Sequence, residues 1–590
     1  MRAFRDIPML RASTLAVVVT AAALIGGCDM NTTNPNAPDT KRAFGSPEGL
    51  TALLAGAVQT WVGTRDNYQV MPLAVMADNY TASWNNAAMR FYSSVGSDCA
   101  SRCGWTNSAT APEAAGGPTV EAQWYGYYAV LNAATLVVSR RTKDSVCFDT
   151  DCSADTTKTA RIITIAKMLQ GLALAGIAEI YDQGFILDET TDLTDPLAIP
   201  FSTRAEVRDA ALLKLDDAYA EAGAKAWSTP ADWMGLGQGQ AYTNVQIQQV
   251  IRTAQAELIA MFPRNAAENA TADWARVATL AAQGVSSGTP FDWNYYVDIN
   301  NRECGLDCTK TWGNSIGSMR VDTRVAALIT TNHVDPWPAP DGNPCPTISP
   351  DKRVGDGSYG PEDDFNGYAT LTETANAGTD FACSGVAIFP PARGQYHQSN
   401  LQHIRYHQLA FRGEDLPTDD ATGQDAMYTP QMNDLLWAEG LIRSGGSKVT
   451  AATLINNSRF GRGGLPQLTG AEADTVLIDA LKYEQEIEFM GQGATPFFNR
   501  RRSGYNAAAA GGRPAYVDGL IPGTPRHMPV PAKELDILQR ALYTFGGGTS
   551  PDMAPAVNGA PRRETVEERY RALQALRPHR SLVTGSLLLF

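Results

Sequence analysis

Hydrophobic residues recur every three to four positions along most of the chain. This spacing predicts amphipathic helices, because residues three and four apart lie on the same helix face. The predicted helices are 49–60, 124–138, 159–181, 204–222, 245–261, 273–283, 431–443, 448–458 and 470–489. Trp124, Trp274 and Trp437 lie on their apolar stripes and are expected in the core. The chain is therefore expected to be mainly α, with helices paired across turns.

The pattern changes in residues 284–429, where Pro, Gly, Asn and Cys interrupt any regular period. Long irregular segments inside compact proteins often carry function. Two helical blocks are thus expected to flank an irregular segment. Helix pairs are typical of helical-repeat scaffolds, although no clean tetratricopeptide consensus is present.

The first 28 residues have the pattern of a bacterial secretory signal. Basic residues precede a short apolar run, Leu15 to Ile25, which is too short for a bilayer span of about 20 residues. Leu24 to Cys28 resembles a lipobox, whose cysteine becomes the lipidated first residue of the mature protein. An ordinary cleaved signal with an incidental Cys28 is the alternative. The lipobox reading predicts a chain anchored to a membrane rather than spanning it.

The chain is expected to divide at changes of composition. We predict a signal peptide at 1–27, a Pro/Asn-rich tether at 28–45 and a main domain at 46–545. The irregular segment 284–429 belongs to that domain. Residues 546–590 begin Gly/Pro/Ser-rich and are expected to form a C-terminal appendage.

Charge and composition exclude one class of partner. The net charge is -14 and the pI is near 5.0, whereas a general nucleic-acid binder needs a basic face. Hydrophobic residues make up 44% and charged residues 19%, as in soluble globular proteins. No nucleic-acid partner is expected.

Apart from Cys28, the cysteines fall into pairs along the sequence. An even set in an exported chain indicates disulfides. The expected pairs are Cys99–Cys103, Cys147–Cys152, Cys304–Cys308 and Cys345–Cys383. Zinc is the alternative, but it needs grouped ligands, and Cys304 and Cys308 have no second pair or His doublet close by.

Several segments, in order, resemble the SusD/RagB family of outer-membrane nutrient-binding lipoproteins. They follow the lipobox and extend to about residue 543, at 52–56, 124–133, 166–184, 207–219, 255–260, 273–277, 435–443, 455–466, 484–489, 497–501 and 528–535. Two features depart from the family pattern. Gln485 stands where the glutamate-rich helix usually has Arg, and the tail after Gly546 has no counterpart.

The resemblance implies a scaffold of tetratricopeptide-like helix pairs with an irregular ligand-binding face. It also implies a partner, a SusC-like TonB-dependent outer-membrane barrel over which the lipoprotein acts as a lid. The protein would be anchored in the outer membrane, exposed at the surface, and would bind an oligosaccharide or a peptide without breaking a bond. It is thus expected not to be an enzyme and to need no cofactor.

Aromatic residues outside the predicted helix cores are the candidate ligand contacts. Sugar rings pack their C–H faces on aromatic rings, while amides bind the hydroxyls. The alternative for each is that it packs a loop onto the scaffold. The candidates are Tyr80, Trp84, Asn85, Trp105, Trp293, Tyr296, Trp312, Trp337 and Tyr359.

Two other functions were weighed against binding. An exported hydrolase would need a nucleophile such as Ser315, but the Gly313–Gly317 motif lacks the apolar strand that should precede it. The glutamates at 484, 486 and 488 alternate along a helix and so do not share one face as an acid/base pair. A purely structural partner of the barrel, without a ligand, is the third possibility.

Metal binding has weak support. His403 and His407 have helical spacing but lack the glutamate base of a metalloprotease motif. Acidic residues cluster in two places, where structural calcium is an alternative to solvated loops. Neither cluster has EF-hand spacing; they are Asp188, Glu189, Asp192 and Asp195, and Asp356, Glu362, Asp363 and Asp364.

Overall fold

The computed structural model describes most of the main domain. The described residues are 44–66, 70–82, 88–94, 102–105, 107, 120–235, 238–297, 310, 319–330, 349–354, 378–383, 399, 401–406, 423–505 and 519–543. The predictions for the signal peptide, Cys28, most of the tether and the C-terminal appendage lie outside these residues.

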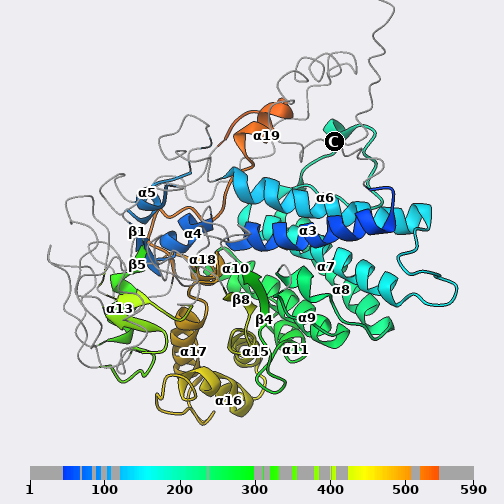
Figure 1. Ribbon diagram of the computed structural model, residues 1–590. Helices are drawn as coiled ribbons and strands as arrows, with labels where there is room; N and C mark the ends of the chain where they lie inside the picture. Colours follow the sequence, from blue (N-terminus) through cyan, green and yellow to red (C-terminus); the bar gives the residue numbers. More distant parts are fainter. Residues whose placement is uncertain are drawn as a thin grey trace, which may run out of the picture. The chain divides into compact units, whose positions relative to one another are not determined.

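The long helices are confirmed close to their predicted limits (Figure 1). They are α3 (Pro47–Asp66), α6 (Glu121–Asp144), α7 (Thr157–Ile180), α8 (Arg204–Ala224), α9 (Asn244–Met261), α11 (Trp274–Ala281), α15 (Pro430–Ser444), α16 (Lys448–Arg459) and α17 (Asp474–Glu488). Side-chain caps start several of them. Thr203 and Thr243 each form a capping box with the residue three positions on, which satisfies backbone N–H groups at the helix start.

Consecutive helices pack as pairs in the N-terminal half, where α6, α7, α8 and α9 each contact the next (Figure 1). The apolar helix α7 has the length and composition of a membrane span, yet 89% of its most apolar window is buried inside the protein. It is the core helix of this block. Glycines allow close approach to its neighbours, because a Cβ at Gly171 would meet Leu215 of α8, and one at Gly176 would meet Tyr127 of α6.

In the C-terminal half, α15 lies between α11, α16 and α17. Their shared core contains Leu435, Ala438, Ile455, Leu477 and Leu481, all buried. Trp124 and Trp274 are also buried, as predicted, and Trp437 packs partly buried against this core.

Short helices appear where no period predicted them. They are α4 (Met71–Met76), α5 (Met89–Ser93), α10 (Ala266–Ala270), α13 (Thr323–Ile329), α18 (Thr495–Arg501) and α19 (Ala532–Ile537), with 3-10 turns at Pro196–Ala198 and Ala231–Met234. Every residue of α4 and of α18 is buried. A helix without an exposed face has no alternation of polar and apolar residues to reveal it.

The strands form two-stranded antiparallel ladders. The pairs are β1 (Tyr80–Ala82) with β5 (Met319–Val321), β2 (Gln183–Gly184) with β3 (Ser202–Thr203), β4 (Trp293–Val297) with β8 (Gly423–Tyr428), and β6 (Phe381–Cys383) with β7 (Leu401–His403). β4 and β8 lie near the two ends of the irregular segment 284–429 and pair with each other. The ladder therefore brings the two ends of the irregular segment together.

The structure confirms the disulfide between Cys147 and Cys152, in the connection between α6 and α7. Cys103 is also disulfide-bonded. Its predicted partner Cys99, the pair Cys304–Cys308, and Cys345 with the side chain of Cys383 lie outside the described residues.

Two interior helix glycines test the packing of α7. Gly176→Ala is expected to lower the free energy of unfolding by about 1–3 kcal/mol, because its Cβ would lie 2.4 Å from the Tyr127 ring. Gly56→Ala in α3 is the matched control. Its Cβ meets nothing within 4 Å, so it should stabilise by about 0.5–1 kcal/mol. Urea unfolding measures both; equal effects would contradict the close contact of α6 and α7.

Candidate functional site

Helix α17 carries three buried glutamates, and each needs a cation. Glu484 and Glu488 lie one turn apart and are fully buried, whereas Glu486 points to the opposite side of the helix. The expectation that these glutamates do not converge is therefore wrong for Glu484 and Glu488. An unpaired carboxylate in such surroundings costs several kcal/mol, so these positions determine which side chains pack against α17.

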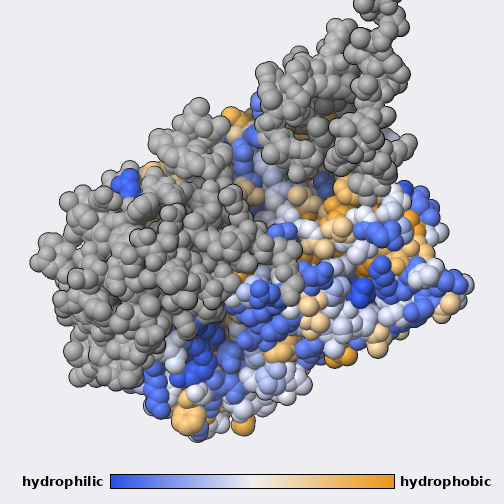
Figure 2. All heavy atoms as spheres, in the orientation of Figure 1, coloured by the Kyte–Doolittle hydropathy of each residue, from blue (hydrophilic) through white to orange (hydrophobic). Residues whose placement is uncertain are grey.

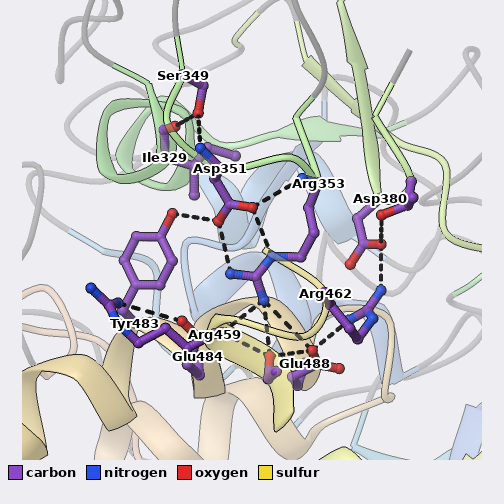
Figure 3. Close-up of polar contacts among 12 residues, drawn as sticks. Ile329, Ser349, Asp351, Arg353, Asp380, Arg459, Arg462, Tyr483, Glu484 and Glu488 are labelled. Atoms are coloured by element: carbon purple, nitrogen blue, oxygen red, sulfur yellow. Dashed lines mark hydrogen bonds and ion pairs between the residues drawn. The ribbon is translucent and has the colours of Figure 1, made fainter. Parts of the chain in front are cut away.

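Arg353, from the irregular segment, supplies the cation for Glu484 (Figure 3). Its guanidinium makes two bonds to Asp351, at 2.9 and 2.7 Å, and one of 2.7 Å to Glu484. Tyr483 donates to Asp351 at 2.7 Å, and Ser458 Oγ lies 2.7 Å from Glu484 Oε2. Arg353 also donates to Ser458 Oγ at 2.9 Å, so its guanidinium is bound by Asp351, Glu484 and Ser458.

Two more arginines surround Glu488. Arg405, also from the irregular segment, contacts Glu488 at 2.6 Å, and Arg462 bridges Glu488 and Asp380 (Figure 3). Burial by itself raises the pKa of Glu488, but Arg405, Arg462 and Arg353 outweigh it and hold that pKa well below its usual range. The carboxylate is therefore ionised and binds the irregular segment to α17.

Glu486 makes the equivalent contact on the other side of the helix. Arg324 of α13 contacts it at 2.6 Å, Asn79 donates to it at 3.1 Å, and Arg500 of α18 lies 3.4 Å away. Arg324, Arg353 and Arg405 thus attach three separate parts of the irregular segment to one helix. These ion pairs hold three described parts of the irregular segment against α17.

A second buried cluster joins α15, α17 and the end of α18. Arg502 makes two bonds to Glu439, at 2.9 and 2.7 Å, and Gln485 donates to Glu439 at 2.9 Å. Arg502 also donates to the Gln485 carbonyl oxygen at 3.2 Å. Gln485, the departure from the family pattern, therefore orients this ion pair without adding a charge.

The structure places three candidate aromatic residues in the interior, which corrects their prediction as ligand contacts. Tyr80, Trp105 and Trp293 are at most 2% exposed. The Tyr80 hydroxyl lies 2.7 Å from His403 Nδ1, Trp105 Nε1 donates to a backbone carbonyl, and Trp293 packs on Tyr428. Their rings join separate segments, which is the packing role weighed for them.

Of the other candidates, the structure describes Tyr296 alone. Tyr296 is half-buried on β4, opposite Gln424 of β8. The remaining candidates lie outside the described residues: Trp84, Asn85, Trp312, Trp337 and Tyr359. Tyr296 is therefore the one partly exposed residue among the described candidates.

The metal alternatives find no support in the described part of the chain, which contains no group of three His, Cys, Asp or Glu side chains placed to hold an ion. Lys214 lies 3.1 Å from Asp188 and 2.9 Å from Glu189, so a lysine supplies the positive charge beside these two carboxylates. Burial lowers the pKa of His403 to about 3, so this histidine is neutral. His407 and the second acidic cluster, from Asp356 to Asp364, lie outside the described residues.

An open cleft of about 570 Å³ lies where the irregular segment leaves and rejoins the helices. Its walls come from the turn after α11, the first turn of α15, helix α16 and the loop from α16 to α17. The lining residues are Ser287, Gln431, Thr453, Asn456, Asn457, Phe460, Gly461, Gln467 and Leu468. Sequence reasoning missed this cleft, because its side chains are scattered over 287–468 without a motif.

Solved structures with a similar fold are SusD superfamily proteins. One from Parabacteroides distasonis has a TM-score of 0.54 at 12% identity, covering 83% of this chain and 97% of that chain. One from Bacteroides vulgatus has a TM-score of 0.51 at 13% identity, covering 84% and 97%. A SusD homolog from Bacteroides thetaiotaomicron has 0.50 at 14%, covering 77% and 89%. The SusD-like, mainly α fold is thereby confirmed.

No protein-family model matches this chain, and no curated protein matches it.

Replacing Arg353 tests the attachment of the irregular segment. Arg353→Met keeps an unbranched, flexible side chain but leaves buried Asp351 and Glu484 without their cation, so we expect a loss of about 3–5 kcal/mol in the free energy of unfolding. Proteolysis within residues 284–429 should also accelerate. Lys448→Met is the matched control, because its pair with Asp474 is exposed and worth about 0–1 kcal/mol. Similar losses in the two variants would show that Arg353 does not attach this segment.

The Glu439 cluster predicts a pH dependence. Burial by itself raises the pKa of Glu439, but Arg502 and then Arg443 outweigh it and hold that pKa to about 2, against 4.5 for a free glutamate. Because the folded-state pKa is lowered, the stabilisation is present above pH 4.5 and is lost as the pH falls towards 2. Glu439→Gln should therefore be less stable than the wild type at pH 7 and approach it near pH 3. A constant difference across urea titrations from pH 7 to 3 would contradict this.

Proposed function

We propose that this chain is an outer-membrane lipoprotein that binds a nutrient, an oligosaccharide or a peptide, and delivers it to a TonB-dependent barrel transporter. One observation carries the proposal: the SusD-like fold extends over 97% of two solved SusD superfamily chains. The lipobox-like residues before Cys28 support it independently, because they predict export and a lipid anchor.

The proposed mechanism is capture and gating, without a bond being broken. Residues 28–45 act as the flexible tether to the membrane, and the folded domain acts as a lid over the barrel. Attachment to α17 supports a preorganised face on the irregular segment, because a preformed surface loses less entropy when a ligand binds.

The proposed ligand contacts are Trp84 and Asn85 together with four residues of the irregular segment, Tyr296, Trp312, Trp337 and Tyr359. Aromatic rings offer flat apolar surfaces to a sugar, and Asn85 offers both a donor and an acceptor to a hydroxyl. The same groups would also bind peptide side chains and backbone. The proposal therefore includes both ligand classes, and the uptake experiment distinguishes oligosaccharides from peptides.

Cys28→Ala tests the anchor and the lid together. We expect the variant to leave the membrane fraction, and cells carrying it to lose uptake of labelled oligosaccharides or peptides. Its free energy of unfolding should be unchanged, because the substitution lies outside the folded domain. The partner is tested by copurification. A TonB-dependent barrel should copurify with the wild type before and after detergent extraction. Val449→Ala, a substitution at an exposed position of the folded domain outside the cleft lining, is the control for expression and anchoring.

Two results would reject the proposal. One is retention of Cys28→Ala in the membrane fraction. The other is wild-type protein that captures no oligosaccharide or peptide and copurifies with no barrel.

A further inference from the structure

The cleft beside α16 has a neutral, hydrogen-bonding lining. Among the described residues that form it, none is charged, and most are amides or hydroxyls. Its volume of about 570 Å³ is within the range of about 300–1,000 Å³ typical of small-ligand sites. The surface over α15, α16 and α17 is mainly hydrophilic in Figure 2, with a few apolar side chains at α16.

Buried Asp434 orients two of the lining side chains. Its carboxylate accepts from Ser287 Oγ at 2.5 Å and from Asn457 Nδ2 at 2.8 Å. Because the Asn457 amide nitrogen is held by the carboxylate, its oxygen is left as the acceptor. Within the described part of the chain, that oxygen has no hydrogen-bond donor from the protein.

Asn456 shapes the wall rather than the binding surface. It donates to the Leu468 carbonyl at 2.8 Å and accepts from the Leu468 N–H at 3.0 Å, which holds the loop after α16 in place. Gln431 and Gln467 differ, because neither side chain bonds to another residue that the structure describes. Each offers a donor and an acceptor to the cleft.

Phe460 adds an apolar surface at the end of α16. Its side chain is 49% exposed, which leaves a large part of the ring without protein contact. An exposed aromatic ring beside several amides suits a ligand that has both apolar C–H faces and hydroxyl groups. Sugar rings have this combination.

We propose that this cleft binds a neutral saccharide unit, with Phe460 under the ring face and Gln431, Asn457 and Gln467 on the hydroxyls. Amides match hydroxyls because both donate and accept. An anionic ligand would call for Arg or Lys in the lining, which the described lining lacks. A peptide would use a strand edge or apolar pockets, whereas Phe460 and Leu468 are the apolar side chains here.

This inference rests on the proposed function, in which the ligand is an oligosaccharide or a peptide. It deepens that function, because it narrows the ligand at this cleft to a saccharide. The cleft is lined by α15, α16, the loop after α16 and Ser287 of the turn after α11. Its lining shares no residue with the aromatic candidates, so each set can be altered without changing the other.

Binding is tested with neutral hexasaccharides of glucose, xylose and mannose at millimolar concentration, by saturation-transfer NMR and calorimetry. We expect the wild type to bind at least one of them. Phe460→Ala and the double variant Gln431→Ala/Gln467→Ala should weaken that binding by at least about fivefold. Phe460→Trp should restore it, and its indole fluorescence should change on addition of the sugar.

Val449→Ala is the matched control, because Val449 is an exposed apolar residue of α16 outside the cleft lining. It should leave the affinity unchanged. Unfolding curves check that every variant is folded.

The cleft proposal is overturned if the wild type binds none of these sugars. It is also overturned if a sugar binds equally to wild type and Phe460→Ala while Phe460→Trp fluorescence stays constant. In that second case the proposal that the irregular segment captures the ligand still stands. Conversely, the variant Cys28→Ala could stay in the membrane fraction while the cleft binds sugar. That result would reject the lipoprotein proposal and leave the proposal of a saccharide site in the cleft standing.

Discussion

The buried glutamates of α17 are the constraint on which the arrangement of this protein depends. Glu484, Glu486 and Glu488 are removed from water, and a carboxylate there is tolerated only with a cation beside it. The cations come from far along the chain, chiefly Arg324 and Arg353 of the irregular segment. Ion pairing at one helix therefore determines where a long, irregular stretch of chain lies against the scaffold.

Hydrophobic burial explains the scaffold but not the placement of the irregular segment. Helices α6 to α9 and α15 to α17 bury apolar stripes against each other, as amphipathic helices do. The described strands between β4 and β8 are three residues long, too short to pack independently. Backbone pairing of β4 with β8 and guanidinium–carboxylate contacts at α17 hold this part instead. Such contacts are directional, so they favour one arrangement over others.

The two regions proposed to bind ligands depend on this arrangement in different ways. The irregular segment, which is attached to α17, would offer aromatic rings, whereas the amide cleft is formed mainly by α15, α16 and the loop after α16. Ser287, near the start of the segment, and Gln431, just after its end, meet in the cleft because β4 and β8 bring the two ends of the segment together. A saccharide site at this junction and a capture face on the loops would both serve an uptake lipoprotein.

The sequence by itself determined the helices, the core tryptophans Trp124 and Trp274, and the Cys147–Cys152 disulfide, because each follows from local period or spacing. The family resemblance correctly anticipated the SusD-like fold. Only the tertiary structure decided that Tyr80, Trp105 and Trp293 are buried, since burial depends on segments distant in sequence. It also decided that Glu484 and Glu488 share Arg353, and that Gln431, Asn457 and Gln467 line one cleft. Local pattern records which face of an element is apolar; which distant side chains meet that element is determined by packing.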